Sequence, residues 1–338
     1  MRGVVFLGNE ARTVREFDDP VPLCGQVRVR LKASGICGSD LGNYRKPPGG
    51  PEPRVIAGHE ACGIIEAVGD RVKHASAGDR VAVYPLLTCG RCEYCQAGDF
   101  MFCPSSKLYG QDLHGSHADL LLTEERNLLP LPDELSFAEG ALVACSASAA
   151  FSALKKLSVP LEATLAIFGQ DPVGLCGLVL AEAMGARVIY LDPSSTRRRL
   201  AGALGASATV DPGDRDPPLA ILELTNGEGV DMALVASGHP GAGRHALESL
   251  RSGGRAALVG AAAELDTLDF SEIQGRQLTL VGSSTMPVHV YSDLVRLLVD
   301  KRVPLERTVT HRFPIEQAQE AFRVLAEGKT GKVVFEWS

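Results

Sequence analysis

The stretch TLAIFGQDPVG, residues 164–174, contains the strand, tight turn and helix start on which the fold assignment depends. An apolar run leads into Gly169, which permits the turn, and Pro172 suits the first turn of a helix. A helical pattern at 173–184 is followed by a second apolar strand pattern, RVIYLD, at 187–192. A strand, a helix and another strand of this kind predict a parallel βαβ unit.

The same alternation continues toward the C-terminus. Four more apolar strand patterns follow, at residues 208–211, 230–238, 255–260 and 277–283. A helical pattern at 195–204 precedes the first of them. Near-continuously apolar strands that alternate with helices are typical of a doubly wound parallel sheet. The fold class expected for this half of the chain is therefore α/β.

The two flanks of this region have a different pattern. On the N-terminal side, short alternating runs separated by Gly, Pro and Asp predict strands at 4–6, 27–33, 62–68 and 78–84. On the C-terminal side, the patterns predict helices at 291–301 and 315–327 and a closing strand at 332–337. That strand needs a partner, and we expect one in the N-terminal β-rich region.

Composition restricts the class of protein. The chain has 338 residues, 45% of them hydrophobic and 22% charged, as in a soluble globular protein of two domains. A formal charge of -7 argues against nucleic acid and anionic membranes as partners. The absence of a long apolar segment or a signal-peptide core favours a cytoplasmic protein with no membrane partner. Nine cysteines in a reducing compartment are then metal ligands or core residues, and we interpret Cys24, Cys62 and Cys176 as core thiols.

Four cysteines lie within fifteen residues, in the pattern Cys89-x2-Cys92-x2-Cys95-x7-Cys103. Four thiolates on short, glycine-containing loops suit a closed tetrahedral zinc site, whose role is structural. The alternatives are an iron–sulfur cluster and four unrelated free thiols.

A second, dispersed set is formed by Cys37 in GICGSD, residues 35–40, and His59 in GHE, residues 58–60. Asp40 can hydrogen-bond the second ring nitrogen of His59 and so fix a ligand imidazole. With Cys145 as a third ligand, three protein groups plus water make the pattern of a catalytic zinc. The alternative is that these are ordinary core residues.

The chain resembles the zinc-dependent medium-chain dehydrogenases, related to alcohol, sorbitol and threonine dehydrogenases. The resemblance rests on these two motifs, on GDRVAV at 78–83, on the four-cysteine lobe and on the glycine turn. The resemblance implies that Cys37, His59 and Cys145 bind catalytic zinc and that Glu60 can approach the metal. It implies that Ser39 accepts the alcohol proton, although Ser39 also suits a turn cap. Zinc would lower the pKa of the substrate hydroxyl, and hydride would pass to the nicotinamide.

The family's architecture implies a GroES-like β-rich catalytic domain, residues 1–140 rejoined by 290–338, and a Rossmann domain at 141–289. It implies a homodimer or homotetramer, with strand 277–283 as the pairing edge. Alcohol dehydrogenases usually carry a relay histidine where this chain has Gly42.

For the cofactor we predict NAD, because Asp192, at the end of the second strand of the βαβ unit, would bind the ribose hydroxyls and repel the extra phosphate of NADP. The alternative role of Asp192 is a helix cap. Asp171 stands where the fingerprint has its middle glycine, and it either faces the pyrophosphate or caps the next helix. The predicted cofactor-binding residues are Gly169, Asp171, Pro172, Val173, Gly174, Asp192, Arg197, Ser237 and Gly260.

The predicted reaction is oxidation of a secondary alcohol in a polyol, sugar, aminocyclitol or aminoglycoside-type substrate. The run GICGSDLGNY, 35–44, resembles dehydrogenases of aminocyclitol and aminoglycoside biosynthesis. The expected pocket walls are polar, as suits a hydroxylated substrate, and contain Asn43, Tyr44, Asp112, His114, His117, Ser283, Ser284, Thr285 and His289. A short-chain alcohol dehydrogenase is the first alternative, and a non-catalytic relative that keeps zinc for structure is the second.

Overall fold

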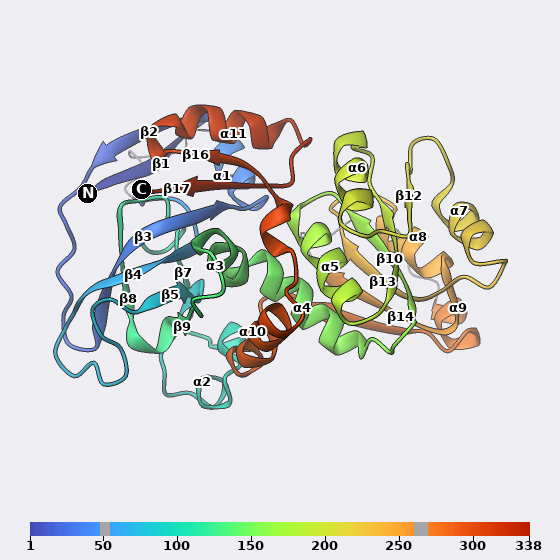
Figure 1. Ribbon diagram of the computed structural model, residues 1–338, viewed down its shortest axis with the longest axis horizontal. Coiled ribbons are helices and arrows are strands. Elements are labelled where there is room, and N and C mark those ends of the chain that lie inside the picture. Colours follow the sequence, from blue (N-terminus) through green and yellow to red (C-terminus); the bar gives the residue numbers. More distant parts are fainter. Residues whose placement is uncertain (48–54, 260–269) are drawn as a thin grey trace.

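The computed structural model describes residues 1–47, 55–259 and 270–338. The chain forms two lobes that lie side by side, each built on its own sheet, with helices α4 (Ser146–Leu157) and α10 (Tyr291–Asp300) between them (Figure 1). Both chain ends lie in the first lobe (Figure 1).

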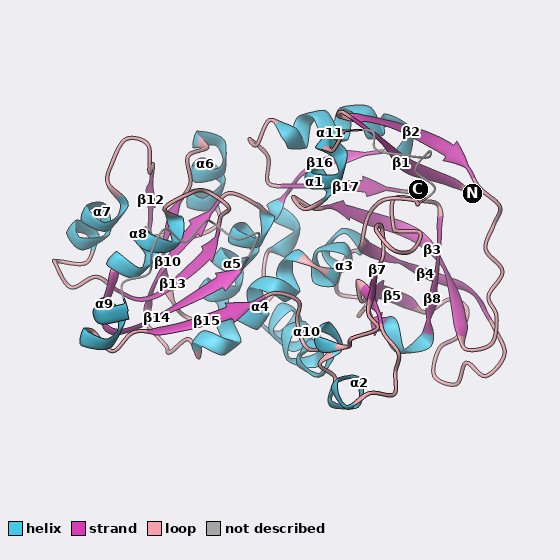
Figure 2. Ribbon diagram, turned by 180° about the vertical axis from the view of Figure 1, so that it is seen from behind, coloured by secondary structure: helices cyan, strands magenta, loops and turns pink. Residues whose placement is uncertain are grey.

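The second lobe is a six-stranded parallel sheet in the order β12-β11-β10-β13-β14-β15 (Figure 2). Its strands are β10 (Thr164–Gly169), β11 (Arg187–Leu191), β12 (Ala208–Val210), β13 (Val230–Ala236), β14 (Leu250–Val259) and β15 (Thr279–Ser283). From β10 the chain first moves outward to β11 and β12, and then returns to the other side of β10 as β13. The strand order therefore reverses at β10, and a crevice for a ligand is expected beyond the carboxyl ends of β10 and β13.

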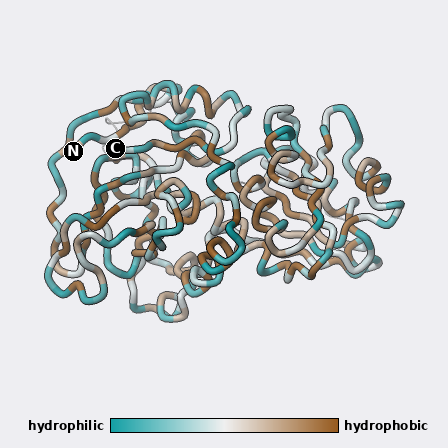
Figure 3. The backbone as a smooth tube through the Cα atoms, viewed as in Figure 1, coloured by the Kyte–Doolittle hydropathy of each residue, from teal (hydrophilic) through white to brown (hydrophobic). Residues whose placement is uncertain are grey.

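Helices cover both faces of this sheet because successive side chains of a strand point to opposite faces. Leu165 and Ile167 pack in the cluster that contains the buried side of α5, whereas Ala166 and Phe168 pack in the cluster that contains α7 and α8. The helices of this lobe are α5 (Pro172–Ala183), α6 (Ser195–Ala203), α7 (Pro217–Leu224), α8 (Ala242–Glu248) and α9 (Phe270–Gly275). Figure 3 shows hydrophobic chain gathered along the central strands and α5.

The first lobe is a seven-stranded sheet in the order β16-β17-β3-β4-β5-β9, with β8 paired to β3. These strands are β3 (Gln26–Ile36), β4 (Glu60–Val68), β5 (Arg80–Val83), β8 (Leu120–Glu124), β9 (Leu128–Pro130), β16 (Val309–Phe313) and β17 (Lys332–Glu336). The remaining strands form two hairpins, β1 (Arg2–Gly8) with β2 (Ala11–Glu16) and β6 (Leu86–Leu87) with β7 (Lys107–Leu108). The helices are α1 (Asp40–Arg45), α2 (Glu93–Ala97), α3 (Phe137–Ala144) and α11 (Ala318–Ala326).

The structure confirms the expected α/β class and most expected elements. The closing strand β17 pairs antiparallel with β3, so the end of the chain does return to the N-terminal β-rich region. The division into domains at 140 and 290 stays a prediction. One expectation was wrong: Cys24 is exposed, whereas Cys62 and Cys176 are buried as expected.

Within the described residues, no single helix is long and apolar enough to cross a membrane. Helices α3 and α4 reach that length only together, and they are bent by 53° where they meet at Cys145. Most side chains of both helices are buried, as in the core of a folded protein.

Candidate active site

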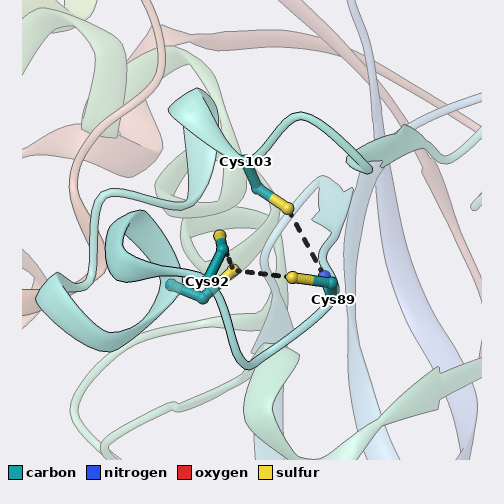
Figure 4. Close-up of side chains that lie close together, drawn as sticks. Cys89, Cys92 and Cys103 are labelled. Atoms are coloured by element: carbon teal, nitrogen blue, oxygen red, sulfur yellow. Dashed lines mark hydrogen bonds between the residues drawn. The ribbon is translucent and has the colours of Figure 1, made fainter.

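The four-cysteine segment folds into a small lobe around α2, with its sulfur atoms turned inward. Figure 4 shows Cys89, Cys92 and Cys103 directed toward a common centre. The Sγ atoms of Cys92 and Cys95 are 3.4 Å apart, those of Cys89 and Cys95 are 3.9 Å apart, and all four sulfurs lie within 4.8 Å of one another. Four sulfurs around zinc at about 2.3 Å would be about 3.8 Å apart, so this donor set fits zinc.

The backbone of the lobe is built for close approach of these sulfurs. Gly98 ends α2 in the left-handed conformation, at φ 82°, and its N–H donates to the carbonyl groups of Tyr94 and Cys95. The N–H of Cys89 points at the sulfur of Cys103, 3.5 Å away. All nine cysteines are unpaired in the structure, so no disulfide between described residues competes for the four thiols.

A second donor set lies at the inner end of the first lobe's sheet. Cys37 follows β3 directly and His59 precedes β4, and the pairing of Gly35 with Glu60 brings these two strand ends together. Cys145 comes from the non-helical break between α3 and α4, and its sulfur is 3.6 Å from Nε2 of His59. Donor atoms of Cys37, His59, Cys145 and Glu60 lie within 4.8 Å of one another. Two thiolates and one imidazole are a ligand set of catalytic zinc, so the residues fit this metal.

Asp40 lies behind His59, on the side away from the sulfurs. Its Oδ1 is 3.6 Å from Nδ1 of His59, a distance that permits charge attraction but is longer than a hydrogen bond. Its Oδ2 accepts a hydrogen bond of 2.9 Å from the N–H of Cys37. Burial opposes ionisation of Asp40, but the charge of His59 and the adjacent imidazoles of His117 and His59 hold its pKa well below the usual range. Asp40 is thus an ionised carboxylate that touches two of the three candidate ligands.

Glu60 is fully buried beside the donor set and forms an ion pair with Lys332 of β17 at 2.6 Å. Lys332 also donates to Ser146 Oγ at 3.1 Å. Burial raises the pKa of Glu60, and the charge of Lys332 opposes this rise. Lys332 is a residue that the sequence analysis missed. A signal existed, because a lysine that opens an apolar strand, KVVF, is unusual unless the charge has a buried partner.

Ser39 directly precedes the short helix α1 and Gly42 lies within it, and both residues are exposed. Ser39 occupies the N-cap position, but its hydroxyl accepts no cap hydrogen bond from the described residues. This hydroxyl, two residues from Cys37, is therefore available to other partners.

The expected polar pocket is only partly assembled. Tyr44 is a correction: it is buried in the aromatic core against Phe6 and Phe322, with the guanidinium of Arg12 over its ring. His117 is also buried, behind Asp40. Among the other expected residues, Ser283 is buried and donates to Ser152 Oγ, whereas Asp112, His114, Ser284 and His289 are exposed.

The glycine turn lies where the strand order of the second lobe reverses. Gly169 ends β10, and a Cβ at this position would overlap the ring of Tyr190. Asp171 is the N-cap of α5: its Oδ1 accepts hydrogen bonds from the N–H groups of Val173, at 2.9 Å, and Gly174, at 3.3 Å. Pro172 occupies the first turn, as expected. The structure therefore shows the cap, and a carboxylate that caps this helix can also face the pyrophosphate, which stays a prediction.

This turn adjoins the second donor set. The pKa of Asp171 is raised to about 7, chiefly by burial and further by the negative charge of Cys37. The negative charge of Cys37 thus acts at the helix N-terminus, where a Rossmann fold binds pyrophosphate.

Asp192 ends β11 and is fully buried. Arg197 approaches it with two nitrogens, at 2.7 and 2.9 Å, and the N–H of Ser194 donates to it at 2.8 Å. The N-cap of α6 is Ser194, whose hydroxyl accepts a hydrogen bond from the N–H of Arg197. Asp192 is therefore not the N-cap residue of this helix.

A pocket opens next to the carboxyl ends of strands β10, β11 and β13. Its lining includes two of the predicted cofactor residues and two histidines that the prediction did not include, namely Gly169, Ser237, His239 and His245. The predicted Gly260 lies outside the described residues.

Comparison with known families gives two matches along the chain. Residues 24–133 match the alcohol dehydrogenase GroES-like domain, and residues 172–300 match the zinc-binding dehydrogenase family.

The chain is 34% identical to the uncharacterized zinc-type alcohol dehydrogenase-like protein YphC of Escherichia coli K12, over 97% of this chain and 96% of that one. It is 33% identical to L-idonate 5-dehydrogenase of Vitis vinifera, covering 91% and 87% of the two chains. It is 31% identical to L-threonine 3-dehydrogenase of Pyrococcus horikoshii, covering 95% and 93%.

Two solved structures have nearly the same fold. Alcohol dehydrogenase TADH from Thermus sp. ATN1 superposes with a TM-score of 0.92 at 29% identity, covering 99% of both chains. Galactitol-1-phosphate dehydrogenase from Escherichia coli superposes with a TM-score of 0.90 at 28% identity, covering 100% of both chains.

Proposed function

The chain belongs to the zinc-dependent medium-chain alcohol dehydrogenase family, and from this premise we propose that it oxidises a secondary alcohol of a polyol, sugar or related hydroxylated compound to a ketone, with NAD as acceptor. The observation that carries the proposal is the convergence of Cys37, His59 and Cys145 beside the glycine turn of the second lobe. A metal ligand set close to a dinucleotide cradle suits hydride transfer between an alcohol and a nicotinamide.

Zinc held by Cys37, His59 and Cys145 would supply positive charge that makes a substrate hydroxyl more acidic. In the reaction, the substrate carbon loses a hydride to the nicotinamide and its oxygen loses a proton. We assign the transfer of this proton to the exposed hydroxyl of Ser39, which would pass it to water. Gly42 offers no side chain for this task. Asp40 holds His59 from behind, and Glu60 stands beside the ligands with its charge matched by Lys332.

On the cofactor side, we propose that the amides at the start of α5 and the pair Asp192–Arg197 orient NAD. The carboxylate of Asp192 disfavours a 2′-phosphate, and Arg197 holds that carboxylate in place. Ser237 lines the adjacent pocket. The four-cysteine lobe would hold the second, structural zinc ion.

The proposed substrate class rests on the activities for which relatives of this chain are named. L-idonate, L-threonine and galactitol-1-phosphate all carry secondary hydroxyls, and the dehydrogenases named for them share this fold or sequence. Within this class we propose an aminocyclitol or aminoglycoside-type substrate, because of the run GICGSDLGNY at 35–44. The competing proposal is a simple short-chain alcohol.

We further propose a cytoplasmic homodimer or homotetramer. Strand β15 is the outer strand of the described parallel sheet, so its free edge can pair with the same strand of a second copy.

The test is a panel of polyols, sugar acids, aminocyclitols and simple alcohols, each incubated with NAD, with NADH formation followed by absorbance. Activity on hydroxylated compounds with little on simple alcohols supports the proposal. A preference for simple alcohols favours the competing one, and no turnover of any member by zinc-loaded protein contradicts both.

A further inference from the structure

A second histidine lies against the carboxylate of Asp40, at the oxygen that His59 does not approach. Nε2 of His117 is 3.6 Å from Oδ2 of Asp40, whereas Nδ1 of His59 is 3.6 Å from Oδ1. The carboxylate therefore lies between two imidazoles, one of which is a candidate metal ligand. His117 itself is fully buried and cannot touch a substrate in the cleft.

The position of His117 is set by its backbone. Its N–H donates to the carbonyl of Ala57 at 2.8 Å, and the neighbouring Ser116 N–H donates to the carbonyl of Gly58 at 2.9 Å. Segment 115–117 thus runs alongside the residues that lead into His59. Gly58 has φ 91°, and a Cβ there would come within 2.5 Å of the His117 ring, so glycine leaves the space that this ring fills.

The ring nitrogens of His117 are used in different ways. Nδ1 lies 2.8 Å from the hydroxyl of Ser34, a second buried residue. Nε2 is buried with no hydrogen-bond partner among the described residues and is aimed at the carboxylate of Asp40. An ionised carboxylate favours the tautomer with its N–H on Nε2, because a lone pair there would face negative charge.

A purely space-filling role would not require a histidine here. The other neighbours of the ring are aromatic, with Phe335 at 5.1 Å and Phe322 at 5.8 Å between ring centres, and a phenyl ring would suit them. A buried polar ring is costly unless its polar atoms are matched. Nδ1 has the hydroxyl of Ser34 as its partner, and the polar atom that faces Nε2 is Oδ2 of Asp40, 3.6 Å away.

We propose that His117 is a positioning residue of the metal site: it holds Asp40 from the side opposite His59, so that Asp40 in turn fixes the ring that offers Nε2 to zinc. This inference rests on the proposed function, because it requires a metal at Cys37, His59 and Cys145. Partners of ligand histidines stabilise bound metal by fixing the ring's orientation and tautomer.

The first test follows the transfer of zinc from the loaded protein to an excess of a chromogenic chelator. The phase from the catalytic site is identified as the one that Cys37→Ser lacks, and the zinc of the four-cysteine lobe serves as an internal reference. His117→Phe is expected to speed the catalytic-site phase by roughly tenfold and to leave the reference phase unchanged. His311→Phe, a histidine stacked on Phe313 in β16, is the matched control and should change neither phase.

Coupling through Asp40 is tested in a double-mutant cycle. If His117 acts through the carboxylate, His117→Phe should have little further effect in an Asp40→Asn background. An equal acceleration in both backgrounds, or an unchanged rate in the single variant, overturns the proposal. A wild-type protein that lacks the catalytic-site phase overturns instead the proposed function on which it rests.

Two polar variants keep the test decisive if the phenyl variant does not fold. The amide of glutamine reaches the position of Nε2 in histidine, whereas that of asparagine reaches the position of Nδ1. His117→Gln should therefore retain zinc nearly as well as the wild type, and His117→Asn should release it faster. Equal release rates for the two variants would show that the contact with Asp40 does not matter.

Discussion

The carboxylate of Asp171 occupies the amides that a dinucleotide needs, and replacing it with asparagine separates its two effects. In the structure, Oδ1 of Asp171 accepts from the N–H groups of Val173 and Gly174 at the start of α5. The pyrophosphate of a Rossmann-bound cofactor lies at this same helix terminus. Asparagine caps a helix as well as aspartate does but carries no charge.

The expected gain in affinity follows from Coulomb's law. A carboxylate about 4 Å from a phosphate is repelled by about 1 kcal/mol in water and about 4 kcal/mol near a protein surface. Taking a value toward the lower of these limits, about 1 to 2 kcal/mol, Asp171→Asn should bind NADH roughly fivefold to thirtyfold more tightly. Asp171→Ala also removes the cap, and should lower the free energy of unfolding by about 0.5 to 2 kcal/mol relative to the asparagine variant.

The pH dependence has a definite sign. The pKa of Asp171 is raised to about 7 in the folded protein from the usual aspartate value of 3.8, so the ionised carboxylate is destabilising and stability is lost as the pH rises between these values. Wild-type affinity for NADH should likewise fall as the pH rises through about 7, and Asp171→Asn should lack this step.

The assay is titration of NADH by its fluorescence, at low and high salt and on both sides of pH 7. The difference between wild type and Asp171→Asn should shrink in high salt, because screened charges repel less. Equal affinity of the two proteins at alkaline pH and low salt would refute the reasoning, since it would show that the carboxylate does not face the pyrophosphate.

Three further predictions concern the zinc lobe, the buried ion pair and cofactor choice. Cys92→Ser should lower the free energy of unfolding by about several kcal/mol, as expected for loss of a structural zinc site, and with it the thermal midpoint and the yield of soluble protein. An unchanged midpoint on calorimetry contradicts this prediction. Lys332→Met should lower the free energy of unfolding by about 3 to 5 kcal/mol because it leaves Glu60 charged and buried, and adding Glu60→Gln should recover part of this loss. Denaturant unfolding of the single and the double variant measures both values, and a double variant no more stable than Lys332→Met counts against the ion pair. The initial rate with NAD should exceed that with NADP by roughly tenfold or more. Asp192→Ser should lower this NAD to NADP rate ratio, because Arg197 is then free to bind the extra phosphate. A wild-type preference for NADP contradicts the role of Asp192 in cofactor choice.

Features that depend on neighbouring residues in the sequence were predictable. The run 164–174 specifies a strand, a turn and a helix within eleven residues, and the structure has β10 and α5 at those places. The four cysteines of the zinc lobe are equally local, because short loops bring them together whatever the rest of the chain does.

Features that depend on pairing between residues far apart in the sequence could not be predicted. Strands β8, β9 and β16 are short, and their place in the first lobe's sheet is set by partners far along the chain. Tyr44 looked like a pocket residue because it follows Cys37 closely, but α1 turns it into the core against Phe322. Lys332 and Glu60 are 272 positions apart, so no local pattern links them.

The measurement that tests the central claim most directly is the zinc content of purified wild type and Cys37→Ser, taken together with their rates of NADH formation on an accepted alcohol. If Cys37, His59 and Cys145 hold the catalytic metal and the four-cysteine lobe holds another, the wild type contains two zinc ions per chain. The Cys37→Ser variant then contains one, keeps its thermal midpoint and loses activity. One zinc or none in the carefully purified wild type, or full activity in Cys37→Ser, would contradict the account.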